Sequence, residues 1–174
     1  DINGDGTSDV LDIVQLVNVI LGGDFANECA AESADLNGDG ATDVLDIVQI
    51  VNIILGRIDV GDATSGKLIR SNDALILEAN GYIGGVQMTL QHGADFTIDL
   101  TDRAMVADYR TVGNETVLVI VAPESDELFT HSGDFEILDM IVQHTMTLTG
   151  ADMASIFELD AASQEMKIVA HRGL

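Results

Sequence analysis

The chain has 174 residues, enough for one or two domains, and carries a formal net charge of −23 at pH 7. All seven Lys and Arg residues lie at or after Arg57. The sequence therefore has no basic patch to contact the phosphates of a nucleic acid, which argues against a nucleic-acid partner. No apolar run approaches the roughly 18 residues of a membrane-spanning helix. Cys29 is the single cysteine, which excludes a disulfide within the chain and leaves a buried thiol or an intermolecular bridge.

Residues 1–12, DINGDGTSDVLD, place oxygen-bearing side chains at alternating positions of a glycine-rich loop. Counting from Asp1, the oxygens stand at positions 1, 3, 5, 9 and 12, and Gly6 takes the sixth position, where an EF-hand calcium loop turns sharply. Position 7 ligates through its backbone carbonyl. Oxygen ligands without His or Cys favour calcium over zinc or iron. The predicted ligands of this loop are Asp1, Asn3, Asp5, Thr7, Asp9 and Asp12.

The same pattern returns 34 residues later, in residues 35–46, DLNGDGATDVLD, with Gly40 at the turn. Its seventh residue is Ala41, whose side chain cannot ligate, and this supports the carbonyl assignment. An Asp/Asn/Gly-rich surface turn explains one copy equally well, but two copies in register favour calcium. The predicted ligands of the second loop are Asp35, Asn37, Asp39, Ala41, Asp43 and Asp46.

A strongly apolar helix is predicted after each loop. From Val10 to Leu21 the only polar residues are Asp12, Gln15 and Asn18, which form one narrow stripe on an otherwise apolar cylinder. The second unit repeats this pattern, and the two units share 17 of 23 positions. Two such helices can cover part of each other, and their remaining apolar surface needs a further partner, inside the chain or outside it.

This duplicated loop–helix unit resembles the type I dockerin family over residues 1–58. It departs from an ordinary EF-hand because position 12 is Asp and because no helix precedes the first loop. The resemblance implies two bound calcium ions and contact with a cohesin partner through positions 10 and 11 of each unit. A chain that begins on a predicted ligand is expected to be a mature product or an excised fragment. With two valines that recur at equivalent places, the predicted partner-binding residues are Val10, Leu11, Val14, Val44, Leu45 and Val48.

Residues 59–66 lack periodicity and are rich in small and polar residues, which predicts a linker that runs into a first strand. Short apolar runs divided by turn signals then predict a β-sandwich or jelly roll over residues 67–174. VQMTLQH alternates cleanly, and ETVLVIVA is apolar enough for a central strand covered on both faces. The predicted strands are Ala74–Ala79, Gly85–Gln91, Asp95–Leu100, Met105–Tyr109, Glu115–Ala122, Asp134–Val142, Thr145–Leu148, Ser155–Leu159 and Met166–Ala170.

The predicted sandwich looks like a cohesin or a related carbohydrate-module fold, on the strength of GYIGGVQMTLQHGADFTIDL and SGDFEILDMIVQ. The predicted fold class is therefore α+β in two parts, a small all-α calcium module followed by an all-β sandwich. A chain that carries both parts can fold one onto the other in cis. It can also dock on a sandwich in trans or link head to tail with other subunits.

Catalytic patterns are weak in this sequence. Its four histidines have no metal-binding spacing, and its serines lie in no nucleophile elbow. Acidic pairs such as Asp99 and Asp102 are more often a solvated face than a glycosidase pair. We therefore expect a non-enzymatic, calcium-dependent assembly module of an extracellular or cell-surface complex that degrades polysaccharides. The alternatives are a structural surface or filament subunit and a carbohydrate-binding module, which two Tyr and no Trp disfavour.

Overall fold

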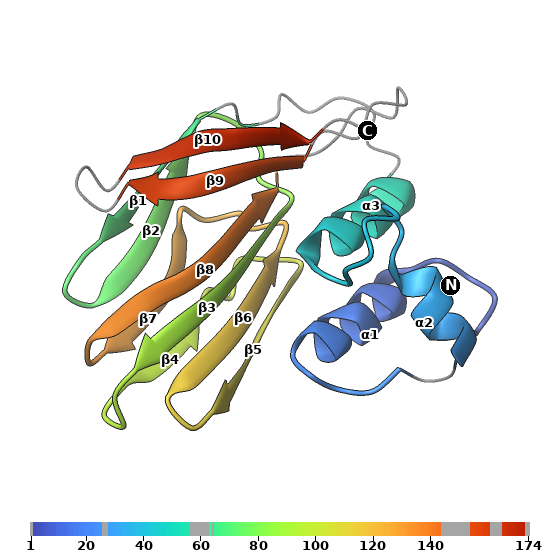
Figure 1. Cartoon of the computed structure of the whole chain (residues 1–174), viewed down its shortest axis with the longest axis horizontal. Helices are drawn as coiled ribbons and strands as arrows, with labels where there is room; N and C mark the ends of the chain where they lie inside the picture. Colours follow the sequence, from blue (N-terminus) through green and yellow to red (C-terminus); the bar gives the residue numbers. More distant parts are fainter. Residues whose placement is uncertain are drawn as a thin grey trace.

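The computed structural model describes residues 2–25, 28–55, 63, 65–143, 154–160 and 165–172, in a helical part followed by a β-rich part (Figure 1). This confirms the predicted fold class. The helices are α1 (Val10–Ile20), α2 (Glu28–Ala34) and α3 (Val44–Leu55). The short α2 was not predicted, and the side chain of Cys29 within it lies outside the described part. Among the described helices, none is both long and apolar enough to cross a membrane.

Each long helix begins at the tenth position of its predicted loop, at a reciprocal cap. The Asp9 carboxylate accepts the Leu11 N–H at 2.8 Å, and the Asp12 carboxylate accepts the Asp9 N–H at 2.9 Å. Such a capping box satisfies two of the N–H groups that a helix start leaves without a partner. The repeated sequence therefore gives two equivalent helix starts. At α3 the same bonds run from Leu45 to Asp43 at 2.8 Å and from Asp43 to Asp46 at 3.0 Å.

The β-rich part consists of two sheets in which the described pairs are antiparallel. The strands are β1 (Gly66–Arg70), β2 (Ala74–Ala79), β3 (Gly85–His92), β4 (Thr97–Leu100), β5 (Val106–Val112), β6 (Glu115–Val121), β7 (Glu127–Ser132), β8 (Phe135–Gln143), β9 (Ala154–Asp160) and β10 (Glu165–Arg172). One sheet has the order β4-β7-β2-β1-β10-β9 and the other the order β5-β6-β3-β8. The sandwich prediction is thus confirmed (Figure 1).

Two strands were missing from the prediction. β1 has the sequence GKLIR and β7 has ELFTHS, and neither shows a clean apolar alternation. Both are nevertheless interior strands, because β1 pairs with β2 and β10, and β7 pairs with β2 and β4. Hydrogen-bonded neighbours on both edges therefore stabilise these two segments as strands, although their local residue pattern does not indicate it. The predicted strand Thr145–Leu148 lies outside the described residues.

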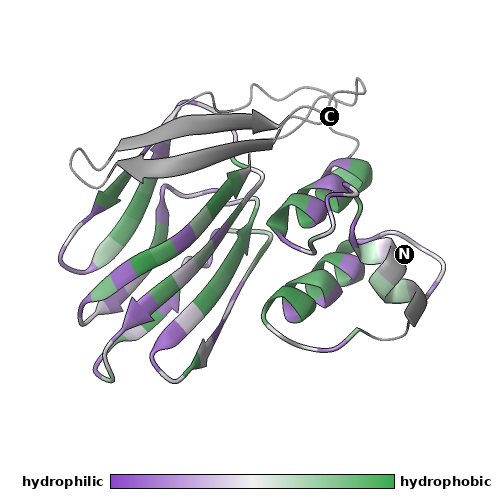
Figure 2. Cartoon of the chain, viewed as in Figure 1, coloured by the Kyte–Doolittle hydropathy of each residue, from purple (hydrophilic) through white to green (hydrophobic). Residues whose placement is uncertain are grey.

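The sandwich core lies between the two sheets. In β3 the side chains of Val86, Met88 and Leu90 are fully buried, whereas Gln87 on the opposite face is half-buried. This is the alternation predicted from VQMTLQH, and the strands show it as alternating apolar and polar residues (Figure 2). The buried row packs against Leu75 and its neighbours in the six-stranded sheet.

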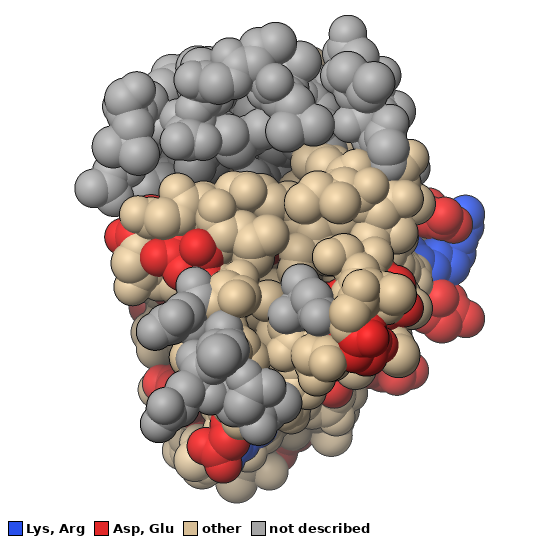
Figure 3. Space-filling model, turned by 90° about the vertical axis from the view of Figure 1, so that its right-hand side faces the viewer, with Lys and Arg blue, Asp and Glu red and all other residues tan. Residues whose placement is uncertain are grey.

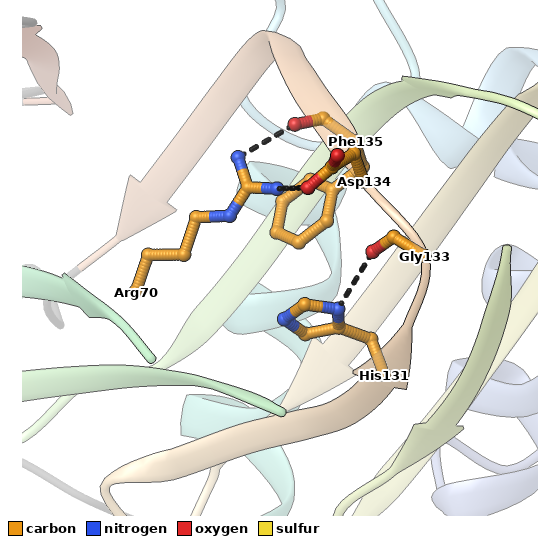
Figure 4. A network of polar contacts seen from close by, with 5 residues as sticks. All are labelled: Arg70, His131, Gly133, Asp134 and Phe135. Atoms are coloured by element: carbon orange, nitrogen blue, oxygen red, sulfur yellow. Dashed lines mark hydrogen bonds and ion pairs between the residues drawn. The ribbon is translucent and has the colours of Figure 1, made fainter. Parts of the chain in front are cut away.

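Arg70 ties the two sheets together at one end of the sandwich. Its guanidinium donates a hydrogen bond of 2.6 Å to the Phe135 carbonyl, lies 4.0 Å from the centre of the Phe135 ring, and stands 3.7 Å from the exposed Asp134 carboxylate (Figure 4). His131 packs edge-on against the same ring and donates a hydrogen bond from Nδ1 to the Gly133 carbonyl at 3.2 Å. Because β1 and β8 belong to different sheets, these contacts give Arg70 and His131 structural roles.

The helical part packs on the outer face of the four-stranded sheet. Val119 and Val121 of β6 are fully buried in a cluster with the apolar faces of α1 and α3. β6 is therefore covered on both faces, as ETVLVIVA predicted, and the chain forms three layers. The packing is close at Gly85, where a Cβ would lie 2.5 Å from Val44 Cγ2 and 3.2 Å from Val48 Cγ2. Gly85 thus allows α3 to approach β3.

This packing predicts opposite effects for two equivalent substitutions. Val48→Asp would place an unpaired charge at a fully buried position and is expected to cost about 3–5 kcal/mol of unfolding free energy. Val14→Asp alters the equivalent residue of α1, which is 49% exposed, and should change stability by no more than about 0.5 kcal/mol. Denaturant unfolding in calcium measures both. Equal losses would contradict the docked arrangement of α3.

Candidate functional site

Both predicted calcium loops turn at glycine. Gly6 has a φ of +91° and Gly40 a φ of +90°, a left-handed backbone that residues with a Cβ rarely adopt. A Cβ at either position would meet nothing within 4 Å, so conformation rather than space requires glycine. The sharp turn predicted at the sixth position is therefore present in both loops.

Alternate side chains in each loop fold back onto the backbone of the same loop. The Asn3 side-chain oxygen accepts the Asp5 N–H at 2.8 Å, and Asp5 Oδ1 accepts the Thr7 N–H at 2.9 Å and the Thr7 hydroxyl at 2.7 Å. These short local bonds fix the loop shape that the sequence spacing encodes. The second loop repeats them, with Asn37 accepting from Asp39 and Asp39 from Ala41, both at 2.8 Å.

The final aspartate of each loop is completely buried and joins the two ends of the loop. Asp12 Oδ1 accepts the N–H groups of Ile2 at 2.6 Å and Asn3 at 3.0 Å, while its Oδ2 accepts from Asp9. A carboxylate has about four lone-pair sites, so three amides leave acceptor capacity for a cation. Asp46 makes the equivalent bonds to Leu36 at 2.7 Å, Asn37 at 3.2 Å and Asp43 at 3.0 Å.

The donor chemistry of the loops fits a hard cation. Their predicted ligands are all oxygens, mostly anionic, which is the set that Ca²⁺ takes in proteins. Within the described residues, no three Asp, Glu, His or Cys side chains are grouped closely enough to hold a metal. Asp1, the first predicted ligand, lies outside the described residues. What the structure supplies is therefore the loop shape and two buried terminal carboxylates, Asp12 and Asp46.

Two carboxylates of the second loop, those of Asp43 and Asp46, have raised pKa values. Burial, reinforced by the negative charges of the three other aspartates of the loop, raises the pKa of Asp43 from its ordinary value of 3.8 to about 6. Burial likewise raises the pKa of Asp46. Closely spaced negative charges in a partly dry site favour either a proton or a metal ion.

Two carboxylates of the first loop, those of Asp5 and Asp12, have lowered pKa values. Burial pushes the pKa of Asp12 upward, but the backbone N–H groups that it accepts outweigh this effect, and its pKa is lowered. Hydrogen bonds from the Thr7 hydroxyl and N–H lower the pKa of the exposed Asp5. Two loops of nearly the same sequence therefore have different electrostatic surroundings.

The predicted partner-binding residues fall into an exposed group and a covered group. We call Val10, Leu11 and Val14 the α1 face, and Val44, Leu45 and Val48 the α3 face. The α1 face is 45%, 54% and 49% exposed, whereas Val44 and Val48 are fully buried and Leu45 is half-buried. Viewed from the side on which the helices lie, the described surface is largely uncharged, with separate groups of Asp and Glu (Figure 3).

Two polar residues of the sandwich that contact the helices were not predicted as site residues. Gln87 Oε1 accepts the Val44 N–H at 3.1 Å, which satisfies a donor at the start of α3. Arg110 donates to the carbonyls of Leu21 at 2.9 Å and Gly22 at 2.7 Å, where the negative end of the α1 dipole favours a cation. The alternation of VQMTLQH does place Gln87 on the outer face, but nothing in the sequence indicates its partner.

Replacing either terminal aspartate is expected to remove one bound calcium ion per chain. Asp12→Ala and Asp46→Ala each delete the last predicted ligand of one loop and leave three backbone amides without their acceptor. Calorimetric titration of the two variants measures the stoichiometry. Asp24→Ala, which alters an exposed acid outside both loops, is the control. Unchanged stoichiometry in both loop variants would contradict the ligand assignment.

Lowering the pH from about 7 to about 5 should weaken calcium binding mainly at the second loop. A proton competes with the ion at Asp43 below its raised pKa of about 6, and one such competition costs about tenfold in affinity. Asp5 and Asp12, with lowered pKa values, stay ionised over this range. Asp12→Ala isolates the second loop for titration and Asp46→Ala isolates the first. Equal losses of affinity would contradict the difference in surroundings.

The comparisons with known proteins address the helical part. Residues 1–55 match the family model described as dockerin type I domain, and the match ends at the last residue of α3. No curated protein and no solved structure matches the chain. Dockerin domains bind calcium, are themselves non-catalytic, and typically occur in extracellular or cell-surface proteins. The repeated loops, the helices that they lead into and the family match together make residues 1–55 similar to a dockerin type I domain, which supports a calcium-dependent protein–protein assembly module.

Proposed function

We propose that this chain is a non-enzymatic assembly protein of an extracellular or cell-surface complex that degrades polysaccharides. Residues 1–58 are its calcium-dependent module, residues 59–66 its linker and residues 67–174 its cohesin-like sandwich. The dockerin match supports the assembly role and the location. The two antiparallel sheets support the sandwich assignment.

In this proposal each loop holds one Ca²⁺ through its six predicted ligands. The ion neutralises carboxylates that otherwise repel one another, and it holds the loop against the first turn of the following helix. The chain's own part is the capping geometry: Asp12 and Asp46 tie the loop ends together. Calcium therefore completes the helix starts that present positions 10 and 11 of each unit.

The observation that carries the proposal is the unequal exposure of the two equivalent helix faces. The α3 face lies on the four-stranded sheet of this chain, with Val44 and Val48 fully buried. The α1 face has nearly the same sequence but is about half exposed. Three adjacent exposed aliphatic side chains on one helix form the kind of patch that marks a protein-binding site.

The occupant that fits the α1 face is a second β-sandwich of the cohesin type, bound in trans. The internal repeat makes the two faces chemically equivalent, and the α3 face is covered by the outer face of an antiparallel sheet. A surface complementary to one face is therefore complementary in type to the other. The α3 face docks in cis, and the α1 face takes an external partner.

Head-to-tail association of identical chains is the alternative. A second copy does offer a sheet that accepts this helix sequence, but that sheet is already covered by its own α3. Linking copies therefore requires each chain first to open its internal contact. The trans partner avoids this cost, and we favour it.

Leu11→Asp is expected to abolish binding to cohesin-type sandwiches without lowering the melting temperature. Leu11 is 54% exposed, so a charge at this position leaves the fold intact. In the complex the same charge would lose its water, and binding should weaken at least ~30-fold, as for a hot-spot residue. Isothermal titration against a panel of such sandwiches in calcium measures this.

The control is Val112→Asp, which alters a similarly exposed aliphatic residue on β5. Two outcomes contradict the proposal. The first is tight binding that survives Leu11→Asp. The second is an absence of binding to every sandwich together with a sedimentation mass that rises with protein concentration, which supports the filament alternative.

A further inference from the structure

The contact between the helical part and the sheet begins within the second calcium loop, at its tenth position. Asp43 is a predicted ligand, and the N–H of the next residue, Val44, donates to Gln87 of β3 at 3.1 Å. The Val44 side chain is fully buried and lies against Gly85. Loop geometry and sheet contact are therefore set by the same peptide unit.

The sheet contact is also sterically tight at this point. A Cβ on Gly85 would stand 2.5 Å from Val44 Cγ2, closer than real contacts allow. The first turn of α3 therefore fits the sheet only when its backbone is placed as the cap of Asp43 and Asp46 places it. A disordered second loop removes that cap and, with it, the surface that the sheet recognises.

The first calcium loop has no equivalent contact among the described residues. Val10, which corresponds to Val44, is 45% exposed. α1 meets the sandwich at its opposite end, where Arg110 donates to the carbonyls of Leu21 and Gly22. The sheet thus supports the loop-proximal end of α3 and the loop-distal end of α1.

We propose that calcium binding at residues 35–46 and docking of the four-stranded sheet on α3 are thermodynamically linked, which makes the second loop the tight calcium site and the first loop the weak one. A site that must be ordered to bind calcium binds more tightly when another contact already orders it. Linkage is reciprocal, so calcium in the second loop also strengthens the docking of the sheet. The inference rests on the proposed function in that calcium fills both loops.

The linkage gives the two calcium ions different roles. The second loop fills first and fixes the sandwich against α3. The first loop fills at a higher calcium concentration and completes the start of α1, which carries the exposed α1 face. Binding in trans therefore follows the occupancy of the first loop, and the internal arrangement follows the second.

Calcium titration of the full chain tests the linkage. Wild type is expected to show two affinities at least about fivefold apart, the lower end of typical coupling between sites. Gln87→Ala removes the bond to Val44 and Gly85→Val wedges the interface, so each should weaken the tight site about fivefold or more and spare the weak one.

The matched control is Gln91→Ala, because Gln91 lies on the same strand and also bonds one backbone group, the Asn114 carbonyl at 2.8 Å, away from the helices. It should leave both affinities unchanged. Asp12→Ala and Asp46→Ala assign the two affinities to their loops. Retention of the β-sheet circular dichroism signal shows that the Gly85→Val variant is folded. If that signal is lost, the calcium affinities of Gln87→Ala alone test the linkage.

Hydrogen exchange gives an independent measure of the same linkage. Asp46→Ala should speed exchange at the start of α3 and expose β3 to the solvent, whereas Asp12→Ala should leave both protected. Two equal affinities that neither Gln87→Ala nor Gly85→Val changes would overturn the linkage while leaving the proposed function intact. A wild-type chain that binds no calcium would overturn the proposed function itself.

Discussion

The outer face of the four-stranded sheet is the surface on which the arrangement of the chain depends. Two helices of nearly the same sequence are each too apolar to face water alone, and one sheet face is available to cover them. The sheet covers Val44 and Val48 of α3, whereas the α1 face stays about half exposed. A sequence with internal symmetry therefore yields a molecule without it, and the difference between the covered α3 face and the exposed α1 face arises from packing.

The same asymmetry reaches the charged loops. Burial raises the pKa of Asp43 in the second loop, and backbone hydrogen bonds lower the pKa of Asp12 in the first. Burial is the largest influence on Asp43, whereas at Asp12 the hydrogen bonds from backbone N–H groups outweigh it. Packing on the sheet and the chemistry of the loops are thus parts of one energetic balance, in which a cation relieves the buried cluster most.

Much of the fold could be predicted because its signals are local. The ligand spacing predicted the loops, the narrow polar stripe predicted the helices, and the alternation around Met88 predicted a core strand. β1 and β7 were not predicted because they are held as strands by a neighbour on each side rather than by their own residue pattern. The contacts of Gln87 and Arg110 were not predicted for a similar reason. Their helix partners lie 43 and 88 to 89 residues away in the sequence, and no local spacing indicates such a contact.

The covered α3 face has a consequence for the architecture of any complex that contains this chain. A module with two open, equivalent faces is divalent and can bridge two neighbours, as a cross-linker does in a growing network. Here one face is already used within the chain, with Val44 and Val48 sealed against Gly85. Under the proposed function the module that remains is monovalent and acts like an end group in a polymer: it attaches through the α1 face alone and does not bridge two partners.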